Sequence, residues 1–463
     1  MMRRIGDWTN GRLAVFIIPV ILLVIALFSR LYELGSFPFF QPGWPTCGGM
    51  PNCAGALTGM PGIYGDEATD LLASHSLVGI FSNFGGGPIA ALLIFVSTNT
   101  LGMTLFAIRL PFAIVSALNG LLVYFTTKTV AQDSGKLAAI LSSLYFIVMM
   151  PALIYGRMAF AENILALLFI INVYSTIKIN RASDNKKWFI LGALSVALAL
   201  IVKFNGIILA MYFIVFLAKS RLLKKGAPYV GLAFALGLAL PLALLQLVTN
   251  DAADLVMIKL YPFVVEMGNQ LGLFHILFLD TLPTGATVAW NLYDVVPEFW
   301  YLLLYVALGA MLVYNYRNYT EIILSLGVFI AFFSALSGAF ESYWLIIIQP
   351  LLAIAFGPGL KKLLQMPIAI SLAFYSVMLV PLYTSVGIYL ITPSRVSSPP
   401  ITNNELFFWN LALMVPFAII LMFSTRISNQ KWKIVINAAL FATYFVVLMI
   451  GTFFLPDLYP YYL

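Results

Sequence analysis

The chain has 463 residues, of which 62% are hydrophobic and only 9% are charged, and its formal net charge is +7. Apolar runs of 16 residues or more recur along it, and runs of this length match the hydrocarbon thickness of a bilayer. Such a chain cannot hide its apolar surface in a water-soluble core. Soluble classes are therefore excluded, and the sequence predicts an all-α polytopic membrane protein.

The first apolar run, residues 13–28, follows the basic leader MMRRIGDWTNGR. A cleaved signal peptide would carry a small-x-small site after this run, and SRLYELG has none. The run therefore predicts a retained first helix. In all, thirteen membrane spans are expected, near residues 12–30, 107–131, 136–156, 162–180, 187–203, 205–218, 228–249, 299–315, 320–338, 342–359, 367–391, 406–424 and 433–455. The short apolar segment 88–102 is a fourteenth candidate.

Basic residues decide the orientation, because loops rich in Lys and Arg stay on the cytoplasmic side. If residues 88–102 do not cross the membrane, 19 of the 25 basic residues lie inside, whereas a crossing places every basic cluster after the first outside. We therefore expect this segment to lie within or along the outer leaflet, with the N-terminus cytoplasmic and the C-terminus extracytoplasmic. The basic residues that then remain outside are Arg30, Arg109, Arg157, Lys203, Lys259 and Arg395.

The spans divide into two membrane modules, and no separate soluble domain is expected. Residues 1–225 form an N-terminal module that includes the first outer loop, residues 31–106, and residues 226–463 form a C-terminal module with a long outer loop at 250–298. Acidic and aromatic residues alternate in the second loop, which makes it the expected place for acceptor recognition. An aromatic belt at the membrane surface is the alternative origin of this composition.

Three carboxylates, Asp66, Glu67 and Asp70, gather in the stretch IYGDEATDLL of the first outer loop. Gly62 and Gly65 interrupt the chain before them, and ATDLLASHSLVGIF predicts an amphipathic helix lying on the membrane interface. Asp66 is a good N-cap residue for this helix, and its acidic neighbours suit the positive end of the helix dipole. Position alone therefore leaves capping and chemistry as equal alternatives.

The same loop holds the only two cysteines of the chain, Cys47 and Cys53. Outside the cytoplasm, a pair at this spacing with Gly and Pro between them can close a small disulfide ring, and two free thiols are the alternative. A zinc site is disfavoured, because the chain has only two histidines, His75 and His275, and zinc usually takes four Cys or His ligands.

Several pieces of sequence follow one another in a recognisable order. They are the Asp-Glu pair with its helix, FGGGPIAALLIFVSTNTLG, AIRLPFAIVSALNGLLVYFTTK, YGRMAFAENILALLF and LALIVKFNGIILA. Together they closely resemble the GT-C membrane glycosyltransferases, above all the protein O-mannosyltransferase and lipid A aminoarabinose transferase group, whose members use polyprenyl-phosphate sugars. The resemblance covers residues 12–220 well and residues 340–357 more loosely. It implies a GT-C fold of about 13 transmembrane helices with a catalytic N-terminal module.

The resemblance also implies a function and a location. A sugar would pass, with inversion, from a dolichyl or undecaprenyl phosphate to a hydroxyl group on a protein, lipid or glycan, at the extracytoplasmic face of the plasma membrane. No nucleic-acid partner is implied. Two departures stand out. Three glycines and one proline at 85–88 replace the polar residue and Pro-Pro pair frequent in relatives, which leaves open which basic residue binds the phosphate. Glu341 stands near Tyr343 where relatives often have Arg, which bears on the preference for the sugar.

The residue types suit this chemistry. Sugar transfer to a hydroxyl needs a carboxylate that takes the acceptor proton and cations that stabilise the departing phosphate. Asp66 is the candidate base, and Glu67 beside it is the second catalytic candidate. Arg157, Lys203 and Arg109 are candidates for binding the donor phosphate, and snorkelling to lipid headgroups is the alternative for each.

Four further residues, Asp70, Glu162, Glu341 and Tyr343, are expected to support the site. Glu162 lies five residues after Arg157, which is a poor spacing for a pair on one helical face. No cofactor is assigned, and a divalent metal ion held by the carboxylates is left open. The rival functions are a transporter or flippase and a non-catalytic scaffold. Coupled transporters keep ionisable residues deep in their helices, whereas every charge here falls at a predicted helix end or in a loop.

Overall fold

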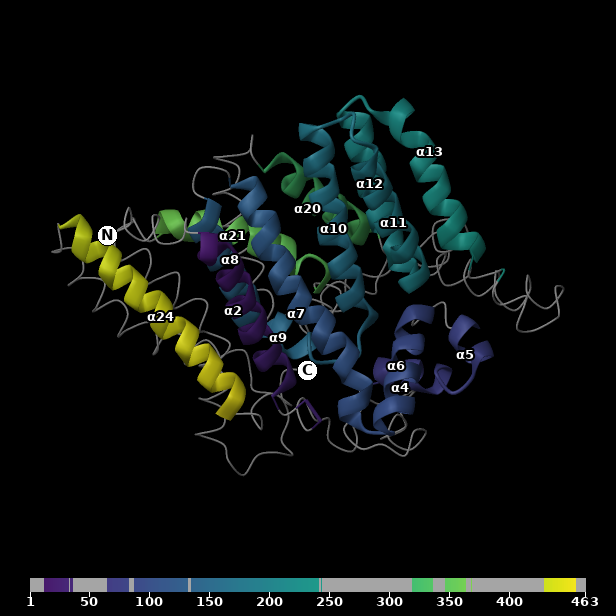
Figure 1. The fold of residues 1–463 in the computed structure, drawn as a ribbon, viewed down its shortest axis with the longest axis horizontal. Helices are drawn as coiled ribbons and strands as arrows, with labels where there is room; N and C mark the ends of the chain where they lie inside the picture. The colour runs from purple at the N-terminus through teal and green to yellow at the C-terminus, as the bar shows by residue number, and fades with distance from the viewer. Residues whose placement is uncertain are drawn as a thin grey trace, which may run out of the picture.

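The computed structural model describes residues 12–32, 34–35, 65–82, 87–131, 135–240, 243, 319–335, 346–363, 368 and 429–454 (Figure 1). Within these residues the regular structure is helical and no strand occurs. The elements are α2 (Arg12–Leu31), α4 (Gly65–Ala73), α5 (Leu77–Ser82), α6 (Pro88–Leu101), α7 (Leu105–Val130), α8 (Gly135–Val148), α9 (Met150–Tyr155), α10 (Ala161–Arg181), α11 (Lys186–Val202), the 3₁₀ turn η2 (Phe204–Gly206), α12 (Ile207–Lys219), α13 (Leu223–Phe234) with a π-helical extension η3 (Ala235–Ala239), α20 (Thr320–Ala335), α21 (Gln349–Leu363) and α24 (Gln430–Phe454).

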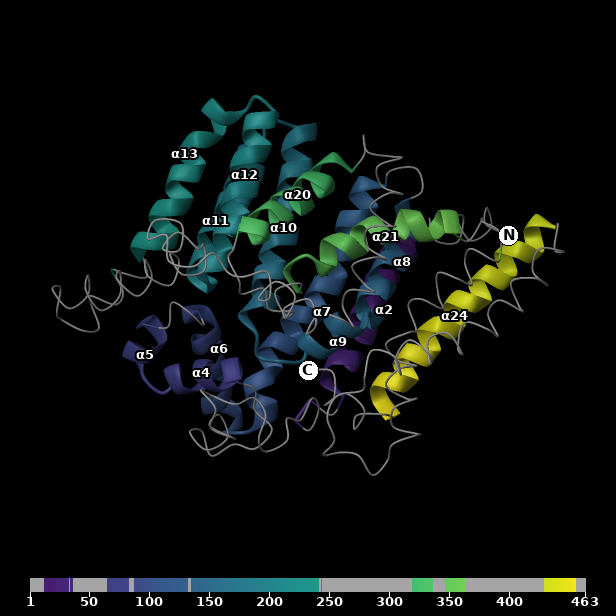
Figure 2. The same ribbon diagram turned by 180° about the vertical axis from the view of Figure 1, so that it is seen from behind.

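Helix α7 is the centre of the arrangement, because it packs against α2, α6, α8, α10 and α21. The helices α10, α11, α12 and α13 stand side by side along one flank of the molecule (Figure 1). On the opposite face, α21 crosses α8 and α20 packs on α12 and α10, as the view from behind shows (Figure 2). The short helices α4, α5 and α6 gather at one end of α7.

The start of α7 is fixed by its own sequence. Thr104 has an extended backbone and its hydroxyl accepts a hydrogen bond from the amide of Ala107 at 3.1 Å, which caps the first turn. From there 26 residues run to Val130. Two helices, α7 and α10, are long and apolar enough to cross a membrane by length and composition, among the residues that the structure describes.

Helix α6 corresponds to the segment 88–102. Its 14 residues span about 21 Å at 1.5 Å per residue, which is less than the roughly 30 Å hydrocarbon core of a bilayer. It packs against α4, α5, α7 and α11. Helices α8 and α12, which are expected to cross, are no longer than α6, so the non-crossing position of this segment stays a prediction.

One face of α2 carries large apolar side chains that no other part of the described structure covers. Phe16, Val20 and Val24 follow one another at four-residue spacing and are exposed, whereas Leu22 and Ala26 face the bundle and are buried. An apolar stripe of this kind on the outside of a helix bundle suits contact with lipid chains.

The structure corrects several predicted boundaries. The expected span 136–156 is two helices, α8 and α9, with a break at Met149 just before Pro151, since proline cannot donate the next helical hydrogen bond. Helix α13 begins at Leu223, ahead of the expected 228. The expected spans 299–315 and 406–424, almost all of 367–391, and the loop 250–298 lie outside the described residues. The number of spans and the orientation of the termini thus stay predictions.

Candidate active site

Helix α4 brings the acidic stretch of the first outer loop onto the bundle. It packs against α6, and its buried face is formed by Glu67, Ala68, Asp70 and Leu71, while Thr69 and Leu72 are exposed. The helix begins at Gly65, so Asp66 lies in its first turn and does not occupy the N-cap position that the sequence predicts. Glu67, the next residue, is buried.

The predicted interfacial helix is also shorter than expected. It is broken at residues 74–76 into α4 and α5, and Ser76 caps the start of α5. The Ser74 hydroxyl donates to the Leu71 carbonyl at 2.7 Å, and the Ser76 hydroxyl accepts from the Gly79 amide at 2.9 Å at the start of α5. His75 between them is exposed.

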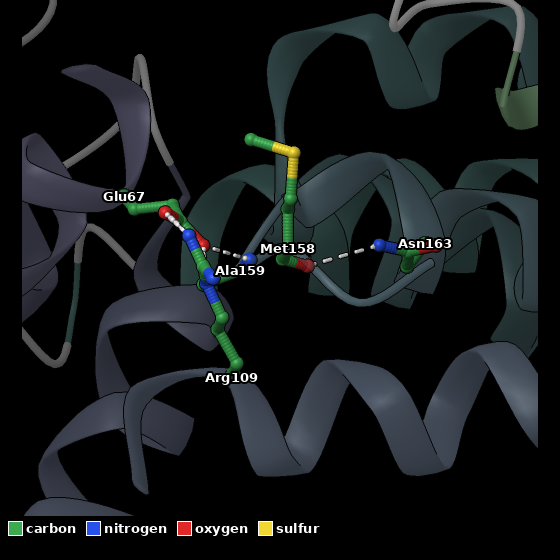
Figure 3. Close-up of polar contacts among 5 residues, drawn as sticks. All are labelled: Glu67, Arg109, Met158, Ala159 and Asn163. Carbon is green, nitrogen blue, oxygen red and sulfur yellow. Dashed lines mark hydrogen bonds and ion pairs between the residues drawn. The ribbon is translucent and has the colours of Figure 1, made fainter. Parts of the chain in front are cut away.

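Glu67 forms a two-pronged ion pair with Arg109 of α7. Arg109 Nε donates to Glu67 Oε1 and Arg109 Nη2 donates to Oε2, both at 2.8 Å, and neither side chain has any exposed surface (Figure 3). The backbone amide of Ala159 donates to the same Oε1 at 2.8 Å. A charged, forked pair of this geometry is among the strongest polar contacts in proteins. It joins α4 to α7 and to the turn before α10.

The turn that receives Glu67 is held from its other side as well. Asn163, in the first turns of α10, donates from its side-chain amide to the carbonyl of Tyr155 at 2.9 Å. It also donates to the carbonyl of Met158 at 3.3 Å (Figure 3). Asn119 of α7 in turn donates to the Asn163 carbonyl at 3.1 Å. The backbone between α9 and α10 is therefore fixed by Glu67 of α4 and Asn163 of α10, and Asn119 of α7 holds the start of α10.

Arg157 lies in this same turn. Its side chain is 1% exposed, and Nη2 donates to the carbonyl of Tyr32, just beyond the end of α2. Snorkelling would place the guanidinium among lipid headgroups, and a buried side chain bonded to a backbone carbonyl does not do so. The chain from Arg157 to Ala159 is only two residues long, so Arg157 lies next to the Glu67 contact.

Lys203 forms an ion pair with Glu162. Lys203 ends α11, Glu162 lies in the first turn of α10, and the Nζ to Oε1 distance is 2.7 Å, with side-chain exposures of 11% and 1%. The sequence offered Arg157 as a partner for Glu162 at a poor spacing, and the structure shows Lys203 in this place.

Gly87 brings the start of α6 to the same region. Its φ is +108°, which favours glycine, and a Cβ at this position would collide with the carbonyl oxygen of Val202 and lie 3.7 Å from the Cβ of Ala161. Pro88 then begins α6. The glycine therefore allows α6 to abut the end of α11 and the start of α10, beside the Lys203–Glu162 pair.

The structure thus brings together Glu67 with Arg109 and Lys203 with Glu162. Arg157 lies close to both contacts along the chain, two positions before Ala159, whose amide binds Glu67, and five positions before Glu162. The carboxylate of Asp66, the side chains of Glu341 and Tyr343, and the pair Cys47 and Cys53 lie outside the described residues or side chains. Within the described part, no group of three His, Cys, Asp or Glu side chains is arranged to hold a metal ion. The roles assigned to all these residues stay predictions.

One buried residue of this region received no role from the sequence. Arg30, in the last turn of α2, is fully buried among α7 and α8. Its signal in the sequence was its position, since it is one of the basic residues at an outer helix end against the positive-inside trend. Asn163 gave no signal of this kind, because a single asparagine near a helix start is common.

The chain resembles known proteins in sequence and in fold. A family model described as dolichyl-phosphate-mannose-protein mannosyltransferase matches residues 86–244. The crystal structure of ArnT from Cupriavidus metallidurans bound to undecaprenyl phosphate matches with a TM-score of 0.55 at 14% identity, covering 96% of this chain and 78% of ArnT. The apo structure of the same protein matches with a TM-score of 0.50 at 14% identity, over 94% and 76% of the two chains. A comparison with curated proteins found no match.

These findings confirm the predicted fold class at the level of architecture. The described part of the chain is helical, and the chain shares the overall fold of ArnT. The family match falls on the stretch that carries α6 to α13, which includes Arg109, Arg157 and Lys203. The resemblance to GT-C membrane glycosyltransferases, first seen in short motifs, is thereby supported by two independent comparisons.

Proposed function

We propose that the chain is a multi-pass glycosyltransferase of the plasma membrane. It moves a sugar from a polyprenyl phosphate to a hydroxyl group of a protein, lipid or glycan at the extracytoplasmic face. The description of the matching family supports the donor class, and so does the undecaprenyl phosphate bound to ArnT, whose fold this chain shares. Dolichyl and undecaprenyl phosphates have the same chemistry at the reacting end.

One observation carries the proposal. The stretch 157–162, which is the turn after α9 and the first residues of α10, is the meeting point of the outer-loop helix, the buried Arg157 and the partly buried Lys203: Ala159 binds Glu67 next to Asp66, Arg157 belongs to the stretch itself, and Glu162 binds Lys203. A catalytic carboxylate and phosphate-binding cations are the two kinds of group that sugar transfer from a phosphate requires.

In the proposed reaction, Asp66 accepts the proton of the acceptor hydroxyl while the oxygen of that hydroxyl attacks the anomeric carbon of the sugar. The bond between that carbon and the phosphate oxygen breaks, so polyprenyl phosphate leaves with the electron pair, and the sugar is bound to the acceptor with inverted configuration. Arg157 and Lys203 stabilise the negative charge that develops on the phosphate. A positioned base contributes about 10²- to 10⁴-fold to such a step.

Glu67 and Arg109 have a positioning role in this proposal. The Arg109 guanidinium faces the Glu67 carboxylate on both prongs and has no exposed surface, whereas the Lys203 side chain, although paired with Glu162, is 11% exposed and can be reached by a donor. Glu67 has its two oxygens occupied by Arg109 and the Ala159 amide. The pair therefore holds α4, and with it Asp66, against α7 and the turn that carries Arg157. Asp70, buried on the same helix, supports this placement.

The test is a transfer assay with the purified protein in nanodiscs. A panel of polyprenyl-phosphate hexoses and pentoses is incubated with hydroxyl-bearing acceptors, and the release of free polyprenyl phosphate is followed. We expect release from at least one donor, in step with glycosylated acceptor. Solute or lipid movement across vesicles without any release would favour the rival transporter or flippase function.

A further inference from the structure

Arg30 is a buried cation whose hydrogen bonds go to neutral acceptors. Nε donates to the Ser116 hydroxyl of α7 at 3.0 Å, and Nη1 donates to the Ser29 hydroxyl at 3.2 Å and the Ile147 carbonyl at 2.9 Å. Nη2 lies 3.5 Å from the Phe146 carbonyl. Burying an arginine is costly unless its donors are satisfied, so the acceptors explain why the side chain is tolerated here.

The Ile147 carbonyl is an unusual acceptor because of Pro151. In a continuous helix, the amide of residue 151 would donate to the carbonyl of residue 147, and proline has no such amide. The helical bonds on either side are made: Met149 donates to Tyr145 and Leu153 donates to Met149, both at 2.9 Å. Arg30 Nη1 therefore supplies, from another helix, the one donor that Pro151 removes.

A second proline of this bundle shows the same arrangement. Pro111 lies inside α7, and the carbonyl four residues earlier, Ala107, accepts a hydrogen bond from the Ser97 hydroxyl of α6 at 2.6 Å. In both places a side chain from a neighbouring helix satisfies the carbonyl that a proline leaves without a donor.

The contact of Arg30 extends to the start of the site. Gly156 follows α9 directly, and a Cβ at Gly156 would meet the Ser116 hydroxyl, Arg30 Nε and the Ala152 carbonyl. The Arg30–Ser116 pair thus packs closely against the backbone of Gly156, one residue before Arg157. Arg157 in turn donates back to Tyr32, two residues after Arg30. Two arginines therefore join the end of α2 to the turn after α9. Arg30 extends from α2 to Gly156, and Arg157 extends from the turn to Tyr32.

We propose that Arg30 is a positioning residue for the proposed transfer. It replaces the donor that Pro151 lacks and thereby fixes the end of α9, so that the following turn presents Arg157 to the donor phosphate and the Ala159 amide to Glu67. The inference rests on the proposed function for its kinetic consequence, whereas the coupling of Arg30 to Pro151 is a property of the fold.

The test is a double-mutant cycle with Arg30→Met, Pro151→Ala and the double variant, each studied as the full chain in detergent. Arg30→Met keeps the apolar stem but leaves the Ile147 carbonyl without its donor, so we expect a lower unfolding temperature. The double variant regains an intrahelical amide donor at position 151, and we expect it to recover most of the loss. Pro111→Ala, which restores an amide elsewhere, is the matched control and is expected to rescue nothing.

Kinetics separate positioning from mere stability. For Arg30→Met we expect the KM for the polyprenyl-phosphate donor to rise about tenfold, with the acceptor KM unchanged, and Pro151→Ala to reverse most of this rise. Additive stability effects, or a donor KM equal to that of wild type, would overturn the proposal. If Arg30→Met gives no folded protein, recovery of folded protein in the double variant is the supporting result and its absence the contrary one. A wild-type protein that releases no polyprenyl phosphate would instead refute the proposed function, while the stability cycle still decides the coupling.

Discussion

Replacing Glu67 with Gln tests the central contact between the outer-loop helix and the bundle. The change keeps the size of the side chain but removes its charge, so fully buried Arg109 loses the carboxylate that neutralises it. An amide also cannot accept both 2.8 Å hydrogen bonds from Arg109, because its nitrogen is a donor. Removing one partner of a buried ion pair typically costs about 3–5 kcal/mol. We therefore expect Glu67→Gln to be strongly destabilised.

The assay is thermal unfolding of the purified variants in one detergent. The double variant Glu67→Met, Arg109→Met removes both charges, and we expect it to unfold at a higher temperature than either single variant, since apolar replacement of a whole buried pair is often neutral. The control is Asp184→Asn. Asp184 is exposed, and its hydrogen bond from Lys225 at 2.7 Å together with the lysine charge lowers the pKa of its carboxyl. Loss of an exposed pair should leave the unfolding temperature unchanged. A Glu67→Gln variant as stable as wild type would refute the argument.

Three further predictions follow from the site. Asp66→Asn is expected to lower turnover by about 10²- to 10⁴-fold while donor binding is retained, and a variant that still turns over would exclude Asp66 as the base. Arg157→Ala is expected to raise the KM for the donor more than the KM for the acceptor; equal increases in steady-state assays would indicate a structural role. Gly87→Ala is expected to lower stability, because its Cβ meets the Val202 carbonyl, and Gly102→Ala is its control, with a φ of +84° but no atom within 4 Å. Equal losses of unfolding temperature in the two glycine variants would contradict the close approach at Gly87.

The sequence predicted the elements of this fold better than their contacts. Apolar runs gave α7, α10 and α11 within a few residues, because a span of such composition has one stable conformation in a bilayer. The distribution of basic residues indicated that segment 88–102 does not cross; the structure shows the segment as the single helix α6, and its position in the membrane stays a prediction. An error arose where a local cap starts a new helix, as Ser76 does at the start of α5.

The partners within the candidate site could not be predicted from spacing. Glu67 and Arg109 are 42 positions apart, and Glu67 and Ala159 are 92 positions apart, so only the packing of α4 on the bundle brings them together. The position of Arg109 at an outer helix end suggested a phosphate ligand, and the same position suits an internal carboxylate equally well. A single sequence does not distinguish these alternatives, because a phosphate and a carboxylate are both anions that an arginine binds.

The hydrogen bond in which Arg30 replaces the amide donor that Pro151 lacks could not be predicted from the sequence either. The sequence shows a proline near the end of an apolar run and an arginine near the end of another, separated by more than a hundred residues. Only the packing of α2 against α8 brings Arg30 to the Ile147 carbonyl, which Pro151 leaves without its helical donor. The outer basic residues were nevertheless the right group to examine, since Arg30, Arg109, Arg157 and Lys203 all bond within the bundle.

The most direct test of the account is the release of polyprenyl phosphate by wild type, Asp66→Asn and Asp184→Asn, measured side by side in nanodiscs with the same polyprenyl-phosphate sugar and acceptor. The account predicts release and sugar transfer by wild type and by Asp184→Asn, and almost none by Asp66→Asn, although all three proteins are folded and bind the donor. Equal release by Asp66→Asn and wild type, or no release by any folded protein with any donor, would contradict it.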